Sequence, residues 1–298
     1  MTEVSQITAP SGVAVDFGGT KISATRLVNG APQDSLKVAT DGTASAAEQV
    51  AAICDLLDQL ALQPQEVVGV ALAGRVDREG CWHALNTETL SDVQAVPLRA
   101  MLSERLARPV AVQNDAVAAA IGEYHFGAGQ GCRDFAFLTV STGVGGGLVL
   151  DGRPVISARG LAGHVGFTTS TLGDRRCGTG RMNTVESRAS GRAIAHYAAE
   201  MGQDGLTAKD VFEAHLAGKD WASELIATSA QAVAELIGNL TSLLDLDRVA
   251  IGGSIGMAEG YLDQVRAHLA AEPAIFRPDV VPVALRAEAA HVGVLTLR

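Results

Sequence analysis

The stretch Val13-Ala14-Val15-Asp16-Phe17-Gly18-Gly19-Thr20-Lys21 decides how this chain folds. Val13–Phe17 is apolar at every position but one, which predicts a strand buried on both faces. Lys21–Val28 predicts a second strand, and the Asn29-Gly30 pair after it is a strong tight-turn signal. The two strands predict a hairpin whose tip carries an acid, two glycines, a threonine and a lysine. A bland turn does not require this combination.

Composition and charge limit the kind of protein. The chain has 298 residues, 47% of them hydrophobic, which is enough for a large core and two lobes. A net charge of −10 argues against partners such as nucleic acid or an anionic membrane. No signal-peptide pattern or spanning apolar stretch is seen, and Cys54, Cys81, Cys132 and Cys177 are too dispersed to suggest a disulfide framework. We therefore expect a cytoplasmic protein.

Strand and helix signals alternate along the chain, which predicts an α/β fold. Further strands are expected at Glu66–Leu72, Val110–Gln113, Phe135–Ser141, Arg248–Ile251 and near the C-terminus. Helices are expected at Thr43–Leu60, after Pro97, from Asn114 to about Tyr124, and at Glu186–Met201, Ala208–Leu216, Ala222–Asp245 and Met257–Ala271. We expect a smaller N-terminal α/β lobe over residues 1–120 and a larger one over 121–286. A final helix at about 287–298 could pack back on the first lobe.

The first hairpin tip has the chemistry of a phosphate site. Gly18 and Gly19 let backbone N–H groups approach a phosphate with no Cβ in the way, and Thr20 adds a hydroxyl donor. Asp16 suits Mg²⁺, which is usually bound through water. A glycine-rich turn without a ligand is the alternative. The spacing fits neither a Walker loop nor a dinucleotide fingerprint.

Two more glycine-rich turns follow strands in the second half. Ser141-Thr142-Gly143-Val144-Gly145-Gly146-Gly147 repeats the first hairpin, with a glycine bulge as the alternative. Two phosphate-type hairpins, one in each lobe, predict a nucleotide between them. Gly252-Gly253-Ser254-Ile255-Gly256 lies at the carboxyl end of a strand, where α/β sheets bind ligands. A tight strand–helix turn is the alternative there.

Asn114-Asp115 stands between an expected strand and an expected helix. Both residue types cap helices well, so an N-cap is the simplest interpretation. A general base for a substrate hydroxyl is compatible with it, because a helix N-terminus favours the ionised carboxylate. Phosphoryl transfer needs one group that accepts the hydroxyl proton, and Asp115 fits that role best. Asn114 could hold a neighbouring sugar hydroxyl.

These motifs, together with Gly160-Leu161-Ala162-Gly163-His164-Val165-Gly166, occur in the order found in the ROK family of sugar kinases. They span nearly the whole chain, which therefore resembles that family. Four segments further resemble the bacterial N-acetylmannosamine kinases within it. They are Gly160–Gly166, Val185–Arg192, Gly252–Gly260 and Ala271–Phe276.

The resemblance implies a two-lobed, actin-like ATPase fold, related to ribonuclease H, with a cleft between the lobes. It implies ATP-dependent phosphorylation of the 6-hydroxyl of N-acetylmannosamine in sialic-acid catabolism, with Mg²⁺ and a homodimer. It implies that Asp115 is the base and that the sugar contacts Gly74, Arg75, Asn86, Asn114, Asp115, His164 and Glu186. The residues expected at ATP are Asp16, Gly18, Gly19, Thr20, Lys21, Thr142, Gly143, Gly145, Gly146, Gly252, Gly253 and Gly256.

The chain departs from the family at its structural zinc. Most members bind zinc with one His and three Cys, whereas the corresponding positions here read Phe167, Cys177, Thr179 and Thr184. A single thiolate does not hold zinc tightly, so we expect no structural zinc. The loop before Glu186 must then be ordered in another way, for which packing of Phe167 and Met182 is one candidate.

A second departure concerns the choice of sugar. His164 stands where many glucokinases of the family have Glu. An imidazole can donate to sugar oxygens where a carboxylate only accepts, which favours a sugar other than glucose. A structural histidine bonded to the loop backbone is the alternative.

The sequence bears on three other functions. A glucokinase or other hexose or N-acetylhexosamine kinase of the family remains open. A ROK repressor would carry a helix-turn-helix domain before its sugar-binding part, whereas 12 residues precede Val13 and the chain is acidic. A non-catalytic sugar binder is disfavoured by Asp115 and both glycine hairpins.

Overall fold

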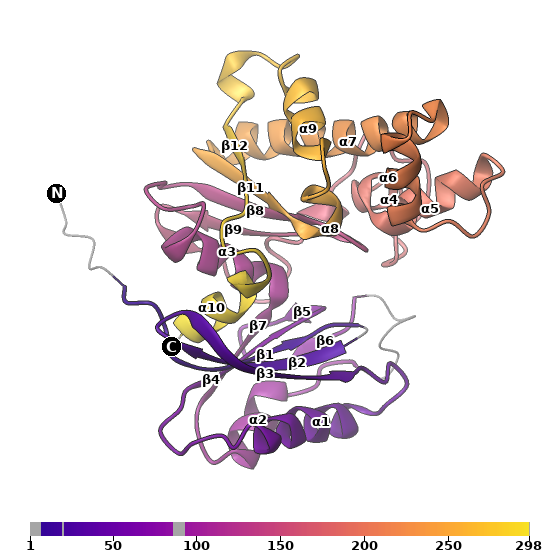
Figure 1. Cartoon of the computed structure of the whole chain (residues 1–298). Coiled ribbons are helices and arrows are strands. Elements are labelled where there is room, and N and C mark those ends of the chain that lie inside the picture. Colours follow the sequence, from indigo (N-terminus) through magenta and orange to yellow (C-terminus); the bar gives the residue numbers. More distant parts are fainter. Residues whose placement is uncertain (1–6, 20, 86–92, 298) are drawn as a thin grey trace. The chain divides into compact units, whose positions relative to one another are not determined.

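The computed structural model describes residues 7–19, 21–85 and 93–297. The chain forms two compact units, shown in Figure 1 with each element labelled. Unit 1 consists of Met1–Gln130, Ile156–Ala162 and Ala287–Arg298, and unit 2 of Gly131–Val155 and Gly163–Arg286. Unit 1 is therefore discontinuous, and the last segment of the sequence returns to complete it.

Within its described residues, unit 1 contains a five-stranded sheet in the order β3-β2-β1-β4-β7. The strands are β1 (Gly12–Phe17), β2 (Lys21–Val28), β3 (Ala31–Ala39), β4 (Val68–Leu72) and β7 (Val110–Asn114). Strands β1, β2 and β3 form antiparallel pairs, whereas β1, β4 and β7 run parallel. Phe17, Leu72 and Asn114 lie in register, so the carboxyl ends of the three parallel strands meet at one edge.

Helices cover both faces of this sheet, as Figure 1 shows. They are α1 (Ala46–Gln59) and α2 (Leu98–Arg105) on one face, and α3 (Asp115–Phe126) and α10 (Ala289–Thr296) on the other. Helix α1 begins at a capping box in which the Ser45 hydroxyl and the Glu48 carboxylate each bond the other's backbone N–H. Its apolar stripe buries Ile53 and Leu57 against the sheet. The short strands β5 (Arg75–Val76) and β6 (Trp82–His83) form a separate two-stranded ribbon.

Helices α3 and α10 approach each other almost backbone to backbone. A Cβ on Gly122 would lie 2.2 Å from the Ala289 carbonyl oxygen, and one on Gly293 would lie 1.7 Å from that of Ala118. Neither position has room for a side chain. These two glycines are what allows the contact.

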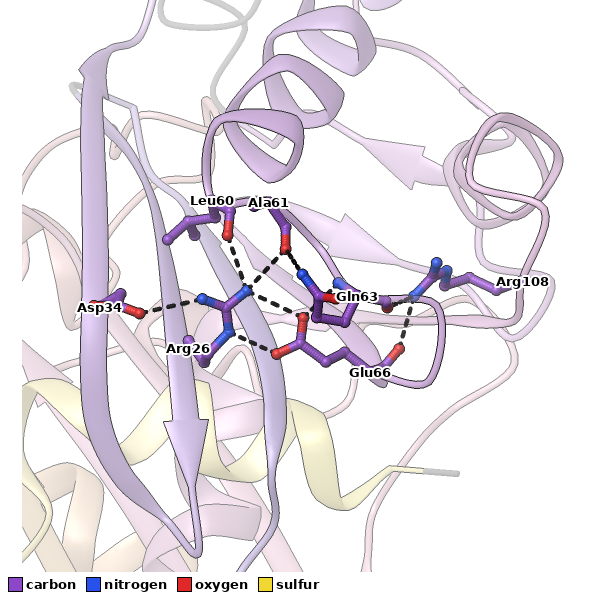
Figure 2. A network of polar contacts seen from close by, with 7 residues as sticks. All are labelled: Arg26, Asp34, Leu60, Ala61, Gln63, Glu66 and Arg108. Atoms are coloured by element: carbon purple, nitrogen blue, oxygen red, sulfur yellow. Dashed lines mark hydrogen bonds and ion pairs between the residues drawn. The ribbon is translucent and has the colours of Figure 1, made fainter.

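A polar network fixes the loop that leads from α1 into β4 (Figure 2). Arg26 of β2 donates from Nε to Glu66 Oε1 at 2.6 Å and from Nη2 to the Leu60 carbonyl at 2.9 Å. Arg108 donates from Nη1 to the carbonyls of Gln63 and Glu66, both at 2.9 Å. Two guanidinium groups thus hold the loop from both sides, where β4 enters the sheet.

Within its described residues, unit 2 repeats the plan of unit 1 with a sheet in the order β10-β9-β8-β11-β12. Its strands are β8 (Phe135–Val140), β9 (Val144–Leu150), β10 (Arg153–Pro154), β11 (Arg248–Gly252) and β12 (Asp279–Pro282). As in unit 1, three strands, β8, β9 and β10, form antiparallel pairs, whereas β8, β11 and β12 run parallel.

The helices of unit 2 enclose its core. They are α4 (Glu186–Ala189), α5 (Gly191–Glu200), α6 (Ala208–Leu216), α7 (Asp220–Leu244), α8 (Gly253–Gly256) and α9 (Tyr261–Leu269). Single turns of 3₁₀-helix occur at η1 (Val165–Phe167), η2 (Ala274–Phe276) and η3 (Arg286–Glu288), which precedes α10. No helix in the described ranges is both long enough and apolar enough to cross a bilayer.

The α/β alternation is confirmed, but four elements differ from expectation. Strand β3 was not anticipated, because it is largely exposed and lacks an apolar pattern. The expected helix Glu186–Met201 is two helices divided at Ser190, whose hydroxyl caps α5. Helix α9 starts only at Tyr261. Glycines 145–147 lie inside β9, so the tip of the second hairpin is Ser141–Gly143.

Candidate active site

Two carboxylates lie at the carboxyl edge of the parallel strands in unit 1. Asp16 is near the end of β1, and Asp115 is the first residue of α3. Asn114 caps α3, since its Oδ1 accepts from the Val117 N–H at 3.0 Å. Its Nδ2 donates to Asp115 Oδ1 and to the Gly74 carbonyl, each at 2.8 Å. The cap interaction and the placement of the Asp115 carboxylate thus depend on one side chain.

The charge of Asp16 influences the protonation of Asp115. Burial raises the pKa of Asp115 to about 6, and the negative charge of Asp16 adds to the increase. Hydrogen bonds from the Ala116 N–H and from Asn114 act in the opposite direction. Burial also raises the pKa of Asp16, while His291 and Lys21 lower it. At neutral pH, Asp115 is therefore mostly ionised and has the pKa of an effective general base.

The structure brings several predicted residues of unit 1 to this edge. Gly74 has φ +104, and a Cβ there would lie 2.7 Å from the His83 carbonyl oxygen, so glycine is required. The Arg75 side chain donates to the Arg159 carbonyl, which holds it beside the same turn. Thr20 and Asn86 lie outside the described residues.

The tip of the first hairpin is open. The Gly18 N–H donates to the Lys21 carbonyl at 2.9 Å, which closes the turn. A Cβ placed on Gly19 would meet no described atom within 4 Å. Gly19 is exposed, so no described atom covers the tip on its side.

In unit 2, Glu186 and His164 are both positioned by strand β9. Glu186 Oε2 accepts from the Val144 N–H at 3.1 Å, and a Cβ on Gly143 would lie only 2.6 Å from that oxygen. Burial raises the pKa of Glu186, whereas the N–H groups of Val144 and Gly178 and the charge of Arg192 lower it. The segment that follows His164 packs on the same strand, because Gly166 lies against the Val144 carbonyl.

His164 immediately precedes η1 and is half-buried. Its ring stacks on that of Phe167, with centroids 5.9 Å apart and planes 11° from parallel. The imidazole thus lies nearly parallel to the Phe167 ring.

A cavity of about 530 Å³ lies within unit 2. Its lining residues are Ser141, Thr142, Gly191, Arg192, Ala195, Leu206, Thr207, Ala208, Lys209, Phe212, Ser254, Ile255 and Ala258. Apolar side chains accompany two cations, and the Ser141 and Ser254 hydroxyls bond each other at 3.0 Å. This volume and mixture suit a ligand with one flat apolar part and one anionic part.

The predicted ATP residues of unit 2 relate to this cavity in different ways. Thr142 lines it directly, and Gly253 and Gly256 flank the lining residues Ser254 and Ile255. Close packing alone accounts for several glycines. A Cβ on Gly253 would lie 2.4 Å from the Val140 carbonyl oxygen, and those on Gly146, Gly252 and Gly256 would meet neighbours at 2.7–2.9 Å. Gly145 pairs with Thr139 across the hairpin. Binding of ATP by these glycines stays a prediction.

The model of the ROK family matches residues 12–298. The chain belongs to the ROK family. It is 39% identical over 293 residues to N-acetylmannosamine kinase of Citrobacter koseri, covering 96% of this chain and 98% of that protein. It is 40% identical over 286 residues to the bifunctional enzyme NanE/NanK of Brucella melitensis, and it spans about half of that relative's length, 53%.

Solved structures agree with this assignment. The ROK family glucokinase from Streptomyces griseus, determined with glucose and AMPPNP, superposes with a TM-score of 0.81 at 31% identity, covering 96% of this chain and 98% of that one. The ROK hexokinase from Thermus thermophilus gives 0.80 at 31% identity, covering 96% and 97%. The predicted family and its actin-like α/β fold are confirmed.

For this ROK protein, the donor set at the family's zinc positions does not fit zinc. Phe167 offers only a ring, which is stacked on His164. Cys177 Sγ bonds the Thr179 hydroxyl at 3.0 Å, and the Thr184 hydroxyl accepts from the Ser187 N–H at 3.1 Å. One thiol and two hydroxyls do not make a zinc site. In unit 1, the carboxylate oxygens of Asp16 are of the kind that Mg²⁺ prefers, directly or through water.

Sequence reasoning missed three residues of these sites. Arg192 and Lys209 line the cavity of unit 2, and His291 of α10 lowers the pKa of Asp16. Arg192 belongs to the segment Val185–Arg192 that carried the family resemblance, so it could have been assigned. Lys209 and His291 belong to no motif, and only the folded chain reveals their positions.

Proposed function

We propose that this chain is a sugar kinase that transfers the γ-phosphoryl group of ATP to the 6-hydroxyl of N-acetylmannosamine, giving N-acetylmannosamine 6-phosphate. The observation that carries the proposal is Asp115, a carboxylate with a pKa of about 6, held in place by Asn114. Family membership and the 39% identity to the kinase of Citrobacter koseri over nearly the full length of both chains support it.

Asp115 accepts the proton of the attacking hydroxyl as the O–P bond forms and the bond from phosphorus to the β,γ-bridging oxygen of ATP breaks. The Asn114 side chain keeps the carboxylate in one orientation and places its own amide beside the Gly74 carbonyl, where a sugar hydroxyl can bond. Mg²⁺ bound near Asp16 would neutralise phosphate charge. The open glycine tip contributes backbone N–H groups to the same phosphates.

The nucleotide and the sugar are assigned to groups that complement them. The cavity in unit 2 suits the adenine and ribose of ATP on its apolar lining, with Arg192 and Lys209 near the phosphates. His164 and Glu186 serve as sugar ligands, one able to donate and the other to accept. An imidazole in that role favours an N-acetylated amino sugar over glucose. A glucokinase or other hexose kinase is the second candidate, favoured by the 31% identity to the Streptomyces griseus glucokinase.

The test is an ADP-release assay with N-acetylmannosamine, glucose and N-acetylglucosamine, with Asp115→Ala as control. We expect the highest kcat/KM on N-acetylmannosamine and loss of turnover in the variant. The 6-deoxy analogue should inhibit competitively without being phosphorylated. Preference for glucose would leave the second candidate. No turnover with any sugar would overturn the kinase proposal.

We also propose a cytoplasmic homodimer in sialic-acid catabolism. All four cysteines are free, as expected in a reducing compartment. Leu243 on α7 and Ile275 on η2 are 78% and 79% exposed on segments that contact each other, and an apolar surface of this kind suits a second copy. Light scattering of the protein and of Leu243→Glu tests the dimer, which the variant should weaken.

A further inference from the structure

The loop Ser170–Thr184, called the substrate loop below, leads into Glu186. It contains Cys177, Thr179 and Thr184, at which other ROK members are expected to hold zinc. All of its residues are described, and they form turns and isolated bridges rather than a helix or a strand. Its conformation must therefore be fixed by side chains.

A phenol ring stands at the base of the loop between two guanidinium groups. The Cζ atoms of Arg175 and Arg188 lie 3.8 and 4.0 Å from the centroid of the Tyr197 ring. Two planar groups cannot both lie so close on one face, so they occupy opposite faces. Tyr197 is 6% exposed, which makes both cation–π contacts largely desolvated and correspondingly strong.

Acidic groups complete this stack. The Tyr197 hydroxyl donates to Asp174 Oδ1, which also accepts from Arg175 Nε at 3.0 Å. Arg175 Nη2 donates to Glu200 Oε2 at 2.9 Å. The hydrogen bonds from Tyr197 and Arg175 hold the pKa of Asp174 below its usual range. Two cations and two anions thus surround one ring, so the cluster carries no net charge.

The stack joins three separate pieces of chain. Arg175 belongs to the substrate loop, Tyr197 to α5, and Arg188 to α4, two residues after Glu186. On the loop side, the Arg175 carbonyl accepts from the Asn183 N–H at 2.9 Å, and the Cys177 N–H donates to the Arg181 carbonyl at 2.9 Å.

This small hairpin also carries Gly178, whose backbone N–H lowers the pKa of Glu186. The two arginines therefore hold the chain on both sides of Glu186. Arg175 lies in the loop before it, and Arg188 lies in α4, which Glu186 begins.

We propose that the Arg175–Tyr197–Arg188 stack orders the substrate loop and fixes the Glu186 carboxylate for the sugar, in the place of a metal. The assignment rests on the proposed function, because Glu186 is a sugar ligand only in a sugar kinase. The three residues are positioning residues and touch neither substrate. Tyr197 also belongs to the hydrophobic core of unit 2, whereas Arg175 and Arg188 do not, so a change at Arg175 tests the stack without removing a core side chain.

Kinetics of matched variants test the proposal. Tyr197→Leu removes the ring, whereas Tyr197→Phe keeps the ring between both guanidinium groups and loses the hydroxyl that bonds Asp174. Arg175→Met removes one face of the stack. Arg181→Met is the control, because Arg181 is an exposed cation of the same loop whose side chain, within the described structure, bonds only the Thr169 hydroxyl.

We expect Tyr197→Leu and Arg175→Met to raise KM for the sugar by roughly tenfold or more and KM for ATP by less than about twofold. Tyr197→Phe and Arg181→Met should stay within about threefold of the parent. Equal changes in both KM values, or a Tyr197→Leu variant with parental KM for the sugar, would overturn the proposal. If Tyr197→Leu does not fold, Arg175→Met decides alone.

Hydrogen exchange separates this proposal from the proposed function. Amides of residues 173–184 should exchange at least about tenfold faster in Arg175→Met than in the parent, with unit 1 unchanged. This readout requires no activity and no sugar. A parent that phosphorylates no sugar but shows the exchange result would refute the kinase and keep the stack. Unchanged exchange would refute the stack.

Discussion

Replacing Asp115 by Asn should make the protein more stable while abolishing turnover. The pKa of the Asp115 carboxyl is raised from its ordinary 3.8 to about 6 by burial and by Asp16. An acid with a raised pKa in the folded state stabilises the fold only while protonated, and it lowers stability as pH rises from the unfolded value through the folded one. The parent therefore carries a penalty at neutral pH that an amide does not.

The magnitude follows from the two pKa values. At ~1.4 kcal/mol per pKa unit, the penalty is roughly 3 kcal/mol at pH 7.5 and roughly 1.5 kcal/mol at pH 5. The Asn amide oxygen can still accept the bonds that the Ala116 N–H and Asn114 now donate to Oδ1 at 2.8 Å. The variant should thus keep the cap of α3, and its free energy of unfolding should rise by most of the penalty at each pH.

The measurement is thermal and urea unfolding of both proteins without nucleotide or Mg²⁺, at pH 5 and 7.5. At about 2–4 °C per kcal/mol, a gain of several degrees is expected at pH 7.5 and about half as much at pH 5. Asp204→Asn is the control, because Asp204 is exposed and its side chain makes no hydrogen bond or ion pair within the described part of the chain. A variant no more stable than the parent at pH 7.5, or one whose gain is the same at both pH values, would refute the reasoning.

Two further substitutions address the sites in unit 2. Gly143→Ala places a methyl group 2.6 Å from the present position of Glu186 Oε2, and the flexible Glu186 side chain can turn away from it. KM for the sugar should therefore rise roughly tenfold, with the melting temperature nearly unchanged. A loss of stability with parental KM would contradict this prediction. Lys209→Ala removes a cation from the lining of the cavity, so KM for ATP should rise roughly three- to tenfold while KM for the sugar stays constant, and a parental KM for ATP would place the nucleotide elsewhere.

Patterns with strong local causes could be predicted from the sequence. Strand β2 begins and ends at the expected residues, Lys21 and Val28, because a glycine turn and an Asn-Gly pair bound it. Helix α6 likewise matches Ala208–Leu216, since Thr207 and Asp210 form a capping box. Asn114 and Asp115 were assigned from their place between a strand and a helix, and they are found together at the sheet edge.

Features set by contacts between distant segments could not be predicted. The exposed strand β3 is held by pairing with β2 and shows little in its own sequence. Arg175 and Tyr197 are far apart in the chain, and nothing in either neighbourhood indicates that one covers the other. The packing of Phe167 and Met182, one candidate for ordering the loop, is not what the structure offers, since Phe167 stacks on His164 and Met182 is 43% exposed.

The discontinuity of unit 1 bears on how the chain is made. Helix α10, which packs on α3, β1 and β4, is translated after all of unit 2. At ~5–20 residues per second, the ribosome needs on the order of ten seconds to pass from the end of α3 to α10. During that interval one apolar face of β1 and β4 lacks its cover. Unit 2 ends at Arg286, so all of it is translated before α10 can complete unit 1.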